Sequence, residues 1–135
     1  MAQRILADSV AYARERKQFG KCIGEFQLIQ QMLADSQAEL YAGWSMVQDC
    51  ARRFDAKPAG KSDADVSMRA SCCKLFCTEM VGRVADRGVQ IHGGSGYIND
   101  YPVERFYRDV RLLRLYEGTT QIQQIIIGRD LVRRG

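Results

Sequence analysis

Apolar residues along this chain recur mainly at intervals of three and four positions, which is the spacing of one face of an α-helix. The pattern covers residues 2–17, 26–54 and 63–90, and it returns in a short stretch after residue 102 and in a last stretch from about residue 119. No segment shows the alternation of apolar and polar residues that is typical of a β-strand. The pattern therefore predicts an all-α fold.

Each of the two long stretches predicts a line of apolar positions that packs against neighbouring helices. In the first of them the line consists of Phe26, Ile29, Leu33, Leu40, Trp44, Val47, Ala51 and Phe54. One step of this line lacks an apolar residue and carries Ser36 or Gln37 instead. In the second the line consists of Val66, Ala70, Cys73, Cys77, Met80 and Val84. The small residues of this second line would permit close approach of another helix.

Glycine and proline mark the breaks between these helices. The segment FGKCIG, residues 19–24, predicts a turn, and it is not a phosphate-binding P-loop because no Gly-Lys-Ser/Thr sequence follows. Residues 55–65 predict a loop, and the glycines of HGGSGY, residues 92–97, end the third helix. Pro102 suits the first position of the short helix. Long helices with short connections predict an antiparallel up-and-down four-helix bundle with an extra C-terminal helix.

Composition and charge narrow the possible functions. The 135 residues suffice for one domain with a core, and the net charge is only +4, with basic and acidic residues interleaved. This distribution fits an anionic small-molecule ligand better than nucleic acid. The longest apolar run is far too short to cross a bilayer, so we expect no membrane span.

Five cysteines and the absence of a signal-peptide pattern predict reduced thiols in a cytoplasmic protein, or a mitochondrial-matrix protein in a eukaryote. Cys72, Cys73 and Cys77 lack the spacing of a zinc site, so no metal is expected. His92 is the only histidine and has no acidic residue or cysteine nearby at ligand spacing. We therefore expect it to have a packing or hydrogen-bonding role.

Glu117 has two interpretations from the residues alone. It precedes Thr119 and Thr120, either of which is a good helix N-cap, and an acidic residue there complements the helix dipole. Alternatively, Leu115, Tyr116, Ile122 and Ile125 could form an apolar pocket that raises its pKa and makes it a proton acceptor. The dipole acts in the opposite direction to this pocket.

Two further segments also have two interpretations. Residues 14–20, RERKQFG, place basic side chains at a helix end, where they complement the dipole, but Arg16 could also clamp a phosphate. The glycines of residues 90–97 form a helix C-cap and a tight turn, or they let a ligand approach the backbone.

Three segments together are similar to one known family. RERKQFGKCIGEFQLIQQMLAD, ADRGVQIHGGSGYINDYPVERFYRDVR and LYEGTTQIQQIIIGR resemble, in this order, the C-terminal helical domain of flavin-dependent acyl-CoA dehydrogenases. Relatives of this family also carry an N-terminal helical domain and a middle β-domain, which are absent from residues 1–135. The resemblance therefore implies one helical domain of a longer protein, or a truncated product, that assembles into a homo-oligomer, either a dimer or a tetramer.

The resemblance also implies FAD as cofactor, bound across a subunit interface. Glu117 matches the catalytic base, Gly118 matches a substrate contact, and Arg16 matches the arginine that holds the FAD pyrophosphate of the partner subunit. The other positions that match FAD contacts are Phe19, Gln27, Gln90, Ile91, His92, Gly93, Gly94, Thr119, Thr120 and Gln121. Gln18 replaces a smaller hydroxyl residue of some relatives, and His92 replaces a usually apolar one.

The reaction that the resemblance implies is α,β-dehydrogenation of an acyl-CoA thioester. Glu117 would remove the α-proton while the β-hydrogen leaves as hydride to flavin N5, and electron-transfer flavoprotein would accept the electrons. An acyl-CoA oxidase is possible on the same residues. A non-catalytic helical oligomerisation module, or a truncated relic of the family, is the alternative from a different functional class.

Overall fold

The computed structural model describes residues 1–56 and 64–134, and most of them are helical. Within these residues the chain forms five α-helices, two short 3-10 helices and one small hairpin. In chain order the elements are α1 (Ala2–Glu15), β1 (Lys17–Gln18), β2 (Lys21–Cys22), η1 (Ile23–Glu25), α2 (Gln27–Ala56), α3 (Ala64–His92), η2 (Gly93–Gly96), α4 (Val103–Leu112) and α5 (Thr120–Arg134). The predicted all-α fold is confirmed, and most of the loop expected at residues 55–65 lies outside the described residues.

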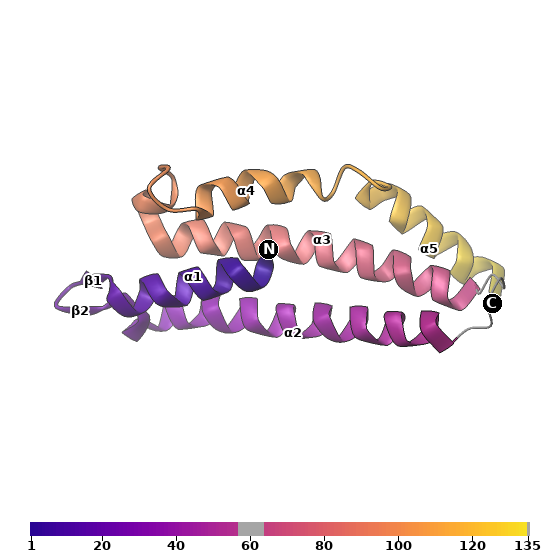
Figure 1. Cartoon of the computed structure of the whole chain (residues 1–135), viewed down its shortest axis with the longest axis horizontal. Helices are drawn as coiled ribbons and strands as arrows, with labels where there is room; N and C mark the ends of the chain where they lie inside the picture. Colours follow the sequence, from indigo (N-terminus) through magenta and orange to yellow (C-terminus); the bar gives the residue numbers. More distant parts are fainter. Residues whose placement is uncertain (57–63, 135) are drawn as a thin grey trace.

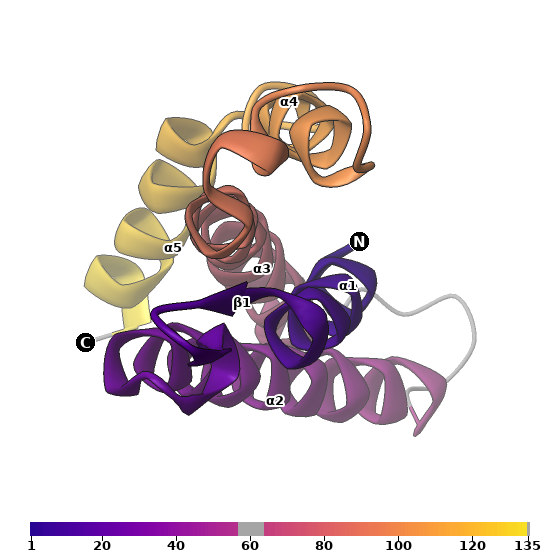
Figure 2. The same ribbon diagram turned by 90° about the vertical axis from the view of Figure 1, so that its left-hand side faces the viewer.

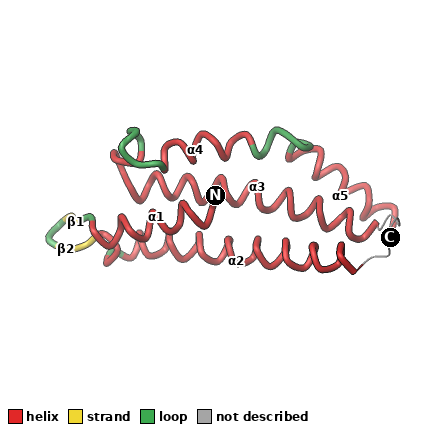
Figure 3. Tube along the Cα trace, in the orientation of Figure 1, coloured by secondary structure: helices red, strands yellow, loops and turns green. Residues whose placement is uncertain are grey.

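Helix α3 lies at the centre of the molecule and contacts the other four α-helices. Helix α2 runs antiparallel beside it, while the shorter α1 covers only the half of this pair that lies towards the hairpin (Figure 1). Helices α4 and α5 follow one another along α3, and the loop between them is drawn in green in Figure 3. Viewed along the bundle from the hairpin end, α1 and α5 lie on opposite sides of α3 (Figure 2). The expected antiparallel bundle with an extra C-terminal helix is therefore confirmed.

The main core forms where α1, α3 and α4 meet. Its buried residues are Ala2, Ile5, Met80, Val81, Val84, Ala85, Val103 and Val110. Gly88 lets these helices come close, because a Cβ atom there would lie 2.7 Å from Cγ2 of Ile5 and 3.0 Å from Cγ2 of Val103. A smaller core of Ala13, Ile23 and Ile91 lies near the hairpin. Burial of these apolar side chains is the main force that holds the bundle together.

The helix ends differ by up to two residues from the predicted ones, each for a local reason. Helix α1 ends at Glu15 instead of residue 17, because Arg16 has extended dihedral angles (φ −68°, ψ 125°) and leads into β1. Pro102 stands at the N-cap of α4 and not at its first helical position, so that expectation was wrong by one residue. The predicted turn at residues 19–24 is present. The two-residue strands β1 and β2 that lie on either side of its tip were not predicted from the sequence.

The predicted packing line of α2 is partly wrong. Trp44 and Phe54 are 62% and 56% exposed, whereas the buried residues of the helix are Ser36 and Gly43. A Cβ atom at Gly43 would lie 3.0 Å from Met80 Cε, so α2 and α3 meet through small residues and the large apolar side chains flank the contact. Ser36 stands where the predicted apolar line of α2 lacks an apolar residue. Its hydroxyl can be buried because it donates to the Met32 carbonyl at 2.7 Å.

The line predicted on α3 is also only partly buried. Val66, Met80 and Val84 are buried, whereas Ala70 is exposed. The helices of the described parts are all too polar or too short to pass through a lipid bilayer.

Candidate functional site

The segment between α4 and α5, residues 114–119, forms a left-handed turn, which we name the Glu117 turn. Glu117 has a φ of +54° and Gly118 a φ of +86°. A non-glycine residue in this conformation is strained by about 1–2 kcal/mol, so surrounding contacts must hold it. Two such contacts reach the backbone: Lys74 Nζ donates to the Gly118 carbonyl at 2.6 Å, and Gln123 Nε2 donates to the Glu117 carbonyl at 3.3 Å.

The start of α5 extends this arrangement. The Ile122 backbone N–H donates to Thr119 Oγ1 at 3.3 Å, so Thr119 is the N-cap that the sequence offered as one of two candidates. The Thr120 hydroxyl donates to Glu79 Oε1 at 2.7 Å, and the Thr120 N–H donates to the Arg114 carbonyl at 3.2 Å. Gln121, the next residue, is exposed. Helix α5 therefore begins with its first turn bound to α3.

The apolar pocket expected around Glu117 is not enclosed by this chain alone. Glu117 is exposed, and the four side chains considered for its walls are each about half exposed. Leu115 is 51%, Tyr116 47%, Ile122 47% and Ile125 45% exposed. The reason is that α5 turns the polar Gln123, only 7% exposed, towards the rest of the chain and leaves Ile122 and Ile125 on its outer side.

A second candidate site lies at the other end of the bundle, beside the hairpin. It is a cavity of about 970 Å³, and we name it the hairpin-end cavity. Among its lining residues are Arg16, Phe19, Gln27, Ile91, His92, Gly93 and Gly94. The fold thus brings together two sequence segments that lie more than sixty positions apart. Of the residues expected in this group, Gln90 is absent from the lining and borders a neighbouring hollow with Gly96 and Tyr97.

The hairpin places an unusual residue at the edge of this cavity. Its two-residue loop consists of Phe19, with a φ of +51°, and Gly20, with a φ of +82°, which matches the positive φ angles of a type I′ turn. Asparagine or glycine is the usual first residue of such a loop, so Phe19 adds strain. Its ring is 92% exposed and meets the edge of Phe26, at 6.1 Å between ring centroids. The strained backbone and the exposed ring make Phe19 a candidate for contact with a ligand.

His92 forms part of the cavity wall and is only 4% exposed. Its ring stacks on Tyr12 at 4.3 Å between centroids and lies 5.4 Å from the ring of Tyr101. Nδ1 lies 2.8 Å from the Gly88 carbonyl, and because a carbonyl only accepts, Nδ1 carries the hydrogen. The packing and hydrogen-bonding role expected for this histidine is therefore observed.

The cavity is suited to an anionic ligand with an aromatic part. Arg16 is exposed and forms no ion pair or side-chain hydrogen bond with any residue in 1–56 or 64–134, so its guanidinium is available. Gly93 has a φ of +59°, and a Cβ atom at Gly93 or Gly94 would have no neighbour within 4 Å. The backbone of this loop is thus open to close approach. An arginine fork, an open backbone and an exposed phenyl ring fit a dinucleotide such as FAD.

The Glu117 turn and the hairpin-end cavity lie far apart. Lys74, which contacts the turn, and His92, which lines the cavity, are separated by 18 positions of α3. At a rise of about 1.5 Å per residue, this separation is about 27 Å along the helix. One chain therefore does not bring the two groups of predicted residues together.

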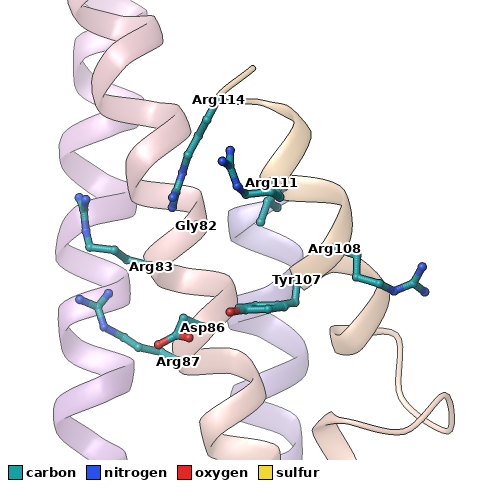
Figure 4. A pocket seen from close by; sticks show the side chains of 9 residues that line it. Gly82, Arg83, Asp86, Arg87, Tyr107, Arg108, Arg111 and Arg114 are labelled. Atoms are coloured by element: carbon teal, nitrogen blue, oxygen red, sulfur yellow. The ribbon is translucent and has the colours of Figure 1, made fainter. Parts of the chain in front are cut away.

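Sequence reasoning missed a third hollow, of about 760 Å³, between α3 and α4 (Figure 4). Five arginines line it: Arg83, Arg87, Arg108, Arg111 and Arg114. Most of their charge is already neutralised within the chain. Glu39 accepts from Arg83 at 2.7 Å and from Arg87 at 2.8 Å, Glu104 pairs with Arg108, and Glu79 pairs with Arg114 at 3.4 Å. Several of these pairs join helices, so we interpret the hollow as mainly structural.

Arg114 also connects this hollow to the Glu117 turn. Its side chain extends from the end of α4 towards α3 at Gly82 (Figure 4). A Cβ atom at Gly82 would collide with the Arg114 guanidinium, so the glycine leaves room for it. The first residue of the Glu117 turn is thus held against α3.

The sequence model described as acyl-CoA dehydrogenase, C-terminal domain, matches residues 1–132. The chain belongs to the acyl-CoA dehydrogenase family and corresponds to its C-terminal domain.

Named relatives agree with this assignment. The probable acyl-CoA dehydrogenase YngJ of Bacillus subtilis is 43% identical over 135 residues, which cover 98% of this chain and 33% of the relative. The caffeyl-CoA reductase-Etf complex subunit CarC of Acetobacterium woodii is 41% identical over 134 residues, which cover 99% of this chain and 34% of the relative. The crystal structure of an acyl-CoA dehydrogenase complexed with FAD from Bacillus anthracis matches with a TM-score of 0.90 at 34% identity, over 98% of this chain and 25% of that chain. The chain thus spans about a third of the length of these curated relatives.

Proposed function

We propose that residues 1–135 form the C-terminal domain of an FAD-dependent acyl-CoA dehydrogenase in which Glu117 is the catalytic base. The observation that carries this proposal is the Glu117 turn. Its carboxylate stands on a strained left-handed backbone just before an N-capped helix, and the adjacent carbonyls are bound by other elements. Strain of this kind concentrates at functional positions.

In this proposal a carboxylate oxygen of Glu117 accepts the α-proton of an acyl-CoA thioester. The carboxylate is exposed in this chain. Enclosure by other domains of a longer protein would remove water from around the carboxylate, which makes it a better proton acceptor. Bound FAD would supply the acceptor for the hydride that leaves the β-carbon. Gly118 leaves room for the substrate beside the base, since it has no side chain.

The hairpin-end cavity would hold the nucleotide part of an FAD molecule. Arg16 would bind its pyrophosphate with two N–H groups, and Phe19 and Gln27 would contact the neighbouring nucleotide groups. Residues 91–94, at the end of α3 and the start of η2, would receive the adenosine end. Thr119, Thr120 and Gln121 would touch FAD near the base. The separation of about 27 Å along α3 supports an arrangement in which the cavity and the turn serve FAD molecules of different subunits in a homo-oligomer.

A second direction of the same chemistry is favoured by one relative. The name of the Acetobacterium woodii relative describes a caffeyl-CoA reductase and a complex with Etf. In a reductase the same carboxyl group of Glu117 would give a proton to the α-carbon instead of removing it. The name also supports electron-transfer flavoprotein as the electron-transfer partner of this chain. Turnover of saturated and unsaturated thioesters, each with the matching electron partner, would distinguish the two directions.

The first experiment tests whether this chain binds flavin. The purified 135-residue chain is mixed with FAD, and its visible absorbance is recorded together with its mass in solution. A bound-flavin spectrum on a dimer or tetramer supports the proposed nucleotide cavity. A colourless oligomer favours the alternative, a helical oligomerisation module without catalysis of its own.

Arg16→Ala should lower the amount of FAD retained, because the pyrophosphate would lose its arginine. Arg14→Ala is the matched control, since Arg14 is exposed in the last turn of α1, two positions before Arg16, and does not line the cavity. Equal flavin content in both variants would refute the pyrophosphate role.

The base assignment is tested in a longer protein that carries this domain with the other domains of the family. Glu117→Gln should abolish nearly all turnover while FAD remains bound, because an amide cannot accept the α-proton. Asp109→Asn is the control, as Asp109 is an exposed carboxylate on α4. Turnover of the Glu117 variant at the level of this control would contradict the assignment.

A further inference from the structure

We propose that Lys74 and Gln123 are positioning residues that hold the backbone beneath Glu117, and that Lys74 is the principal one. This inference rests on the proposed function of Glu117 as a base. Neither residue lines the hairpin-end cavity, and within the described residues neither forms a hydrogen bond with the Glu117 side chain. They act on the two peptide carbonyls that determine where this side chain points.

The backbone of the turn explains why such a clamp is needed. Glu117 and Gly118 both have positive φ angles, and their carbonyls accept hydrogen bonds from the side chains of Gln123 and Lys74. A strained backbone relaxes unless neighbouring groups bind the strained form better than the relaxed one. Rotation of either peptide unit would move the Glu117 carboxylate.

Lys74 binds the strained form with a charged donor. Its ammonium donates to the Gly118 carbonyl at 2.6 Å, and the side chain reaches there from the middle of α3, 44 positions earlier in the sequence. Hydrogen bonds with an ionised donor are short and about twice as strong as neutral ones. Because α3 is the central helix, this bond ties the turn to the most extensively packed element of the chain.

Gln123, on α5, binds the preceding carbonyl. Its side chain is only 7% exposed, and its amide nitrogen donates to the Glu117 carbonyl at 3.3 Å. The same nitrogen would lie 2.6 Å from a Cβ atom at Gly118, so the glycine is required for Gln123 to reach its place. The buried amide and the missing side chain are thus parts of one arrangement.

A second anchor prevents the turn from moving as a unit. Glu79 accepts from the Thr120 hydroxyl and forms an ion pair with Arg114, so it contacts the first residue of the turn and the residue just after the turn. Glu79 is five positions after Lys74 on α3, which places the two anchors about 7.5 Å apart along the helix axis. With both ends of the turn attached, the Lys74 and Gln123 bonds orient the peptides between them.

The consequence for catalysis is specific. A base that is displaced by a fraction of an ångström still permits substrate binding, but it meets the α-proton less often in a productive geometry. Loss of Lys74 should therefore lower kcat and leave KM nearly unchanged. It should also make proton removal more rate-limiting and so raise the isotope effect of an α-deuterated substrate.

The test uses Lys74→Met in the full-length flavoenzyme that carries this domain, with Arg69→Met as matched control. Arg69 is a cation on the same helix whose partners are Asp65 and Asp49, neither of which belongs to the turn. We expect kcat of Lys74→Met to fall about ten- to a hundredfold, which corresponds to about 1.4–2.7 kcal/mol. KM should change less than about threefold. Lys74→Arg, which keeps a charged donor, should recover part of the loss.

A second measurement needs neither FAD nor activity. Amide hydrogen exchange in the 135-residue chain should be about tenfold faster at Thr120 in Lys74→Met than in wild type, because its N–H bond to Arg114 closes the turn. Gln123→Met should act in the same direction. Amides in the middle of α3 should exchange as in wild type, which shows that the domain is folded.

The outcomes separate this inference from the proposed function. If Glu117→Gln is inactive while Lys74→Met matches Arg69→Met in kcat, isotope effect and exchange, the positioning role is overturned and the base assignment stands. If Glu117→Gln retains full turnover, the base assignment is overturned, and the catalytic positioning role with it. A parallel loss of kcat and protection at Thr120, without such a loss in Arg69→Met, supports the clamp.

Discussion

Two glycines ten positions apart should respond in opposite ways to replacement by alanine. Gly118→Ala places a side chain where φ is +86°, which costs about 1–2 kcal/mol. The new Cβ atom would lie 2.6 Å from Gln123 Nε2, so the amide must move and its bond to the Glu117 carbonyl is lost at about 0.5–1.5 kcal/mol. A less flexible unfolded chain returns part of this loss, and we expect a net destabilisation of about 1–3 kcal/mol.

Gly128→Ala is the matched control. Gly128 lies inside α5, is exposed, and a Cβ atom there would have no neighbour within 4 Å. Alanine is the better helix former, so this replacement should stabilise the chain by about 0.5–1 kcal/mol.

The assay is urea unfolding of the 135-residue chain followed by far-UV circular dichroism, with the slope of the transition compared between variants. Gly118→Ala should unfold at a lower urea concentration than wild type, and Gly128→Ala at a higher one. If Gly118→Ala is as stable as wild type, the left-handed turn is not a strained and clamped element in solution. Lys74 would then have no strained backbone to hold.

Three further predictions concern other parts of the chain. Phe19→Asn should stabilise the hairpin by about 1 kcal/mol in urea unfolding, because asparagine tolerates positive φ, and it should lower FAD retention if the exposed ring contacts the nucleotide. Glu39 is partly buried, which by itself raises its pKa, but hydrogen bonds and charge attraction from Arg87 and Arg83 outweigh burial and lower the pKa below 4.5. The stability that the Glu39 carboxylate contributes is therefore fully present above pH 4.5 and is lost as the pH falls further. Glu39→Gln should destabilise the chain by about 1 kcal/mol at pH 7. The difference in urea midpoint between this variant and wild type should become smaller in acid. Burial and the neighbouring Cys50 raise the pKa of the Cys73 thiol to about 11. Iodoacetamide should therefore alkylate Cys73 more slowly at pH 8 in the folded chain than in urea. Equal rates would show that the thiol is not shielded.

The helices were predictable because their signals are local. Periodic apolar residues, glycines at breaks and threonines before α5 act within a few positions of themselves, so their effect does not depend on the rest of the fold. The two-residue error at the end of α1 arose where Arg16 leaves the helix to form a hairpin. That hairpin depends on the pairing of Lys17 with Cys22, which the spacing of apolar residues does not predict.

The packing face of α2 was predicted less well, for a tertiary reason. Apolarity alone points to Trp44 and Phe54, but the distance to α3 is set by the smallest side chains between the two helices. Ser36 and Gly43 are therefore the buried residues of α2, although neither has the large apolar side chain from which a packing face is predicted. A line of small residues at intervals of seven was the signal that could have revealed this face.

For the candidate sites, too, some features could be predicted from the sequence and others depended on the tertiary structure. The sequence by itself determined the helical class and the family resemblance, and it made Glu117 the candidate base, because these signals lie in residue order over short stretches. Only the tertiary structure decided that residues 16–27 and 91–94 share one cavity, and that it lies far from the Glu117 turn. Only the tertiary structure placed Lys74 against the Gly118 carbonyl, 44 positions away. Such a contact depends on how whole helices pack, since side chains distant in sequence meet only after the apolar core has aligned the elements that carry them.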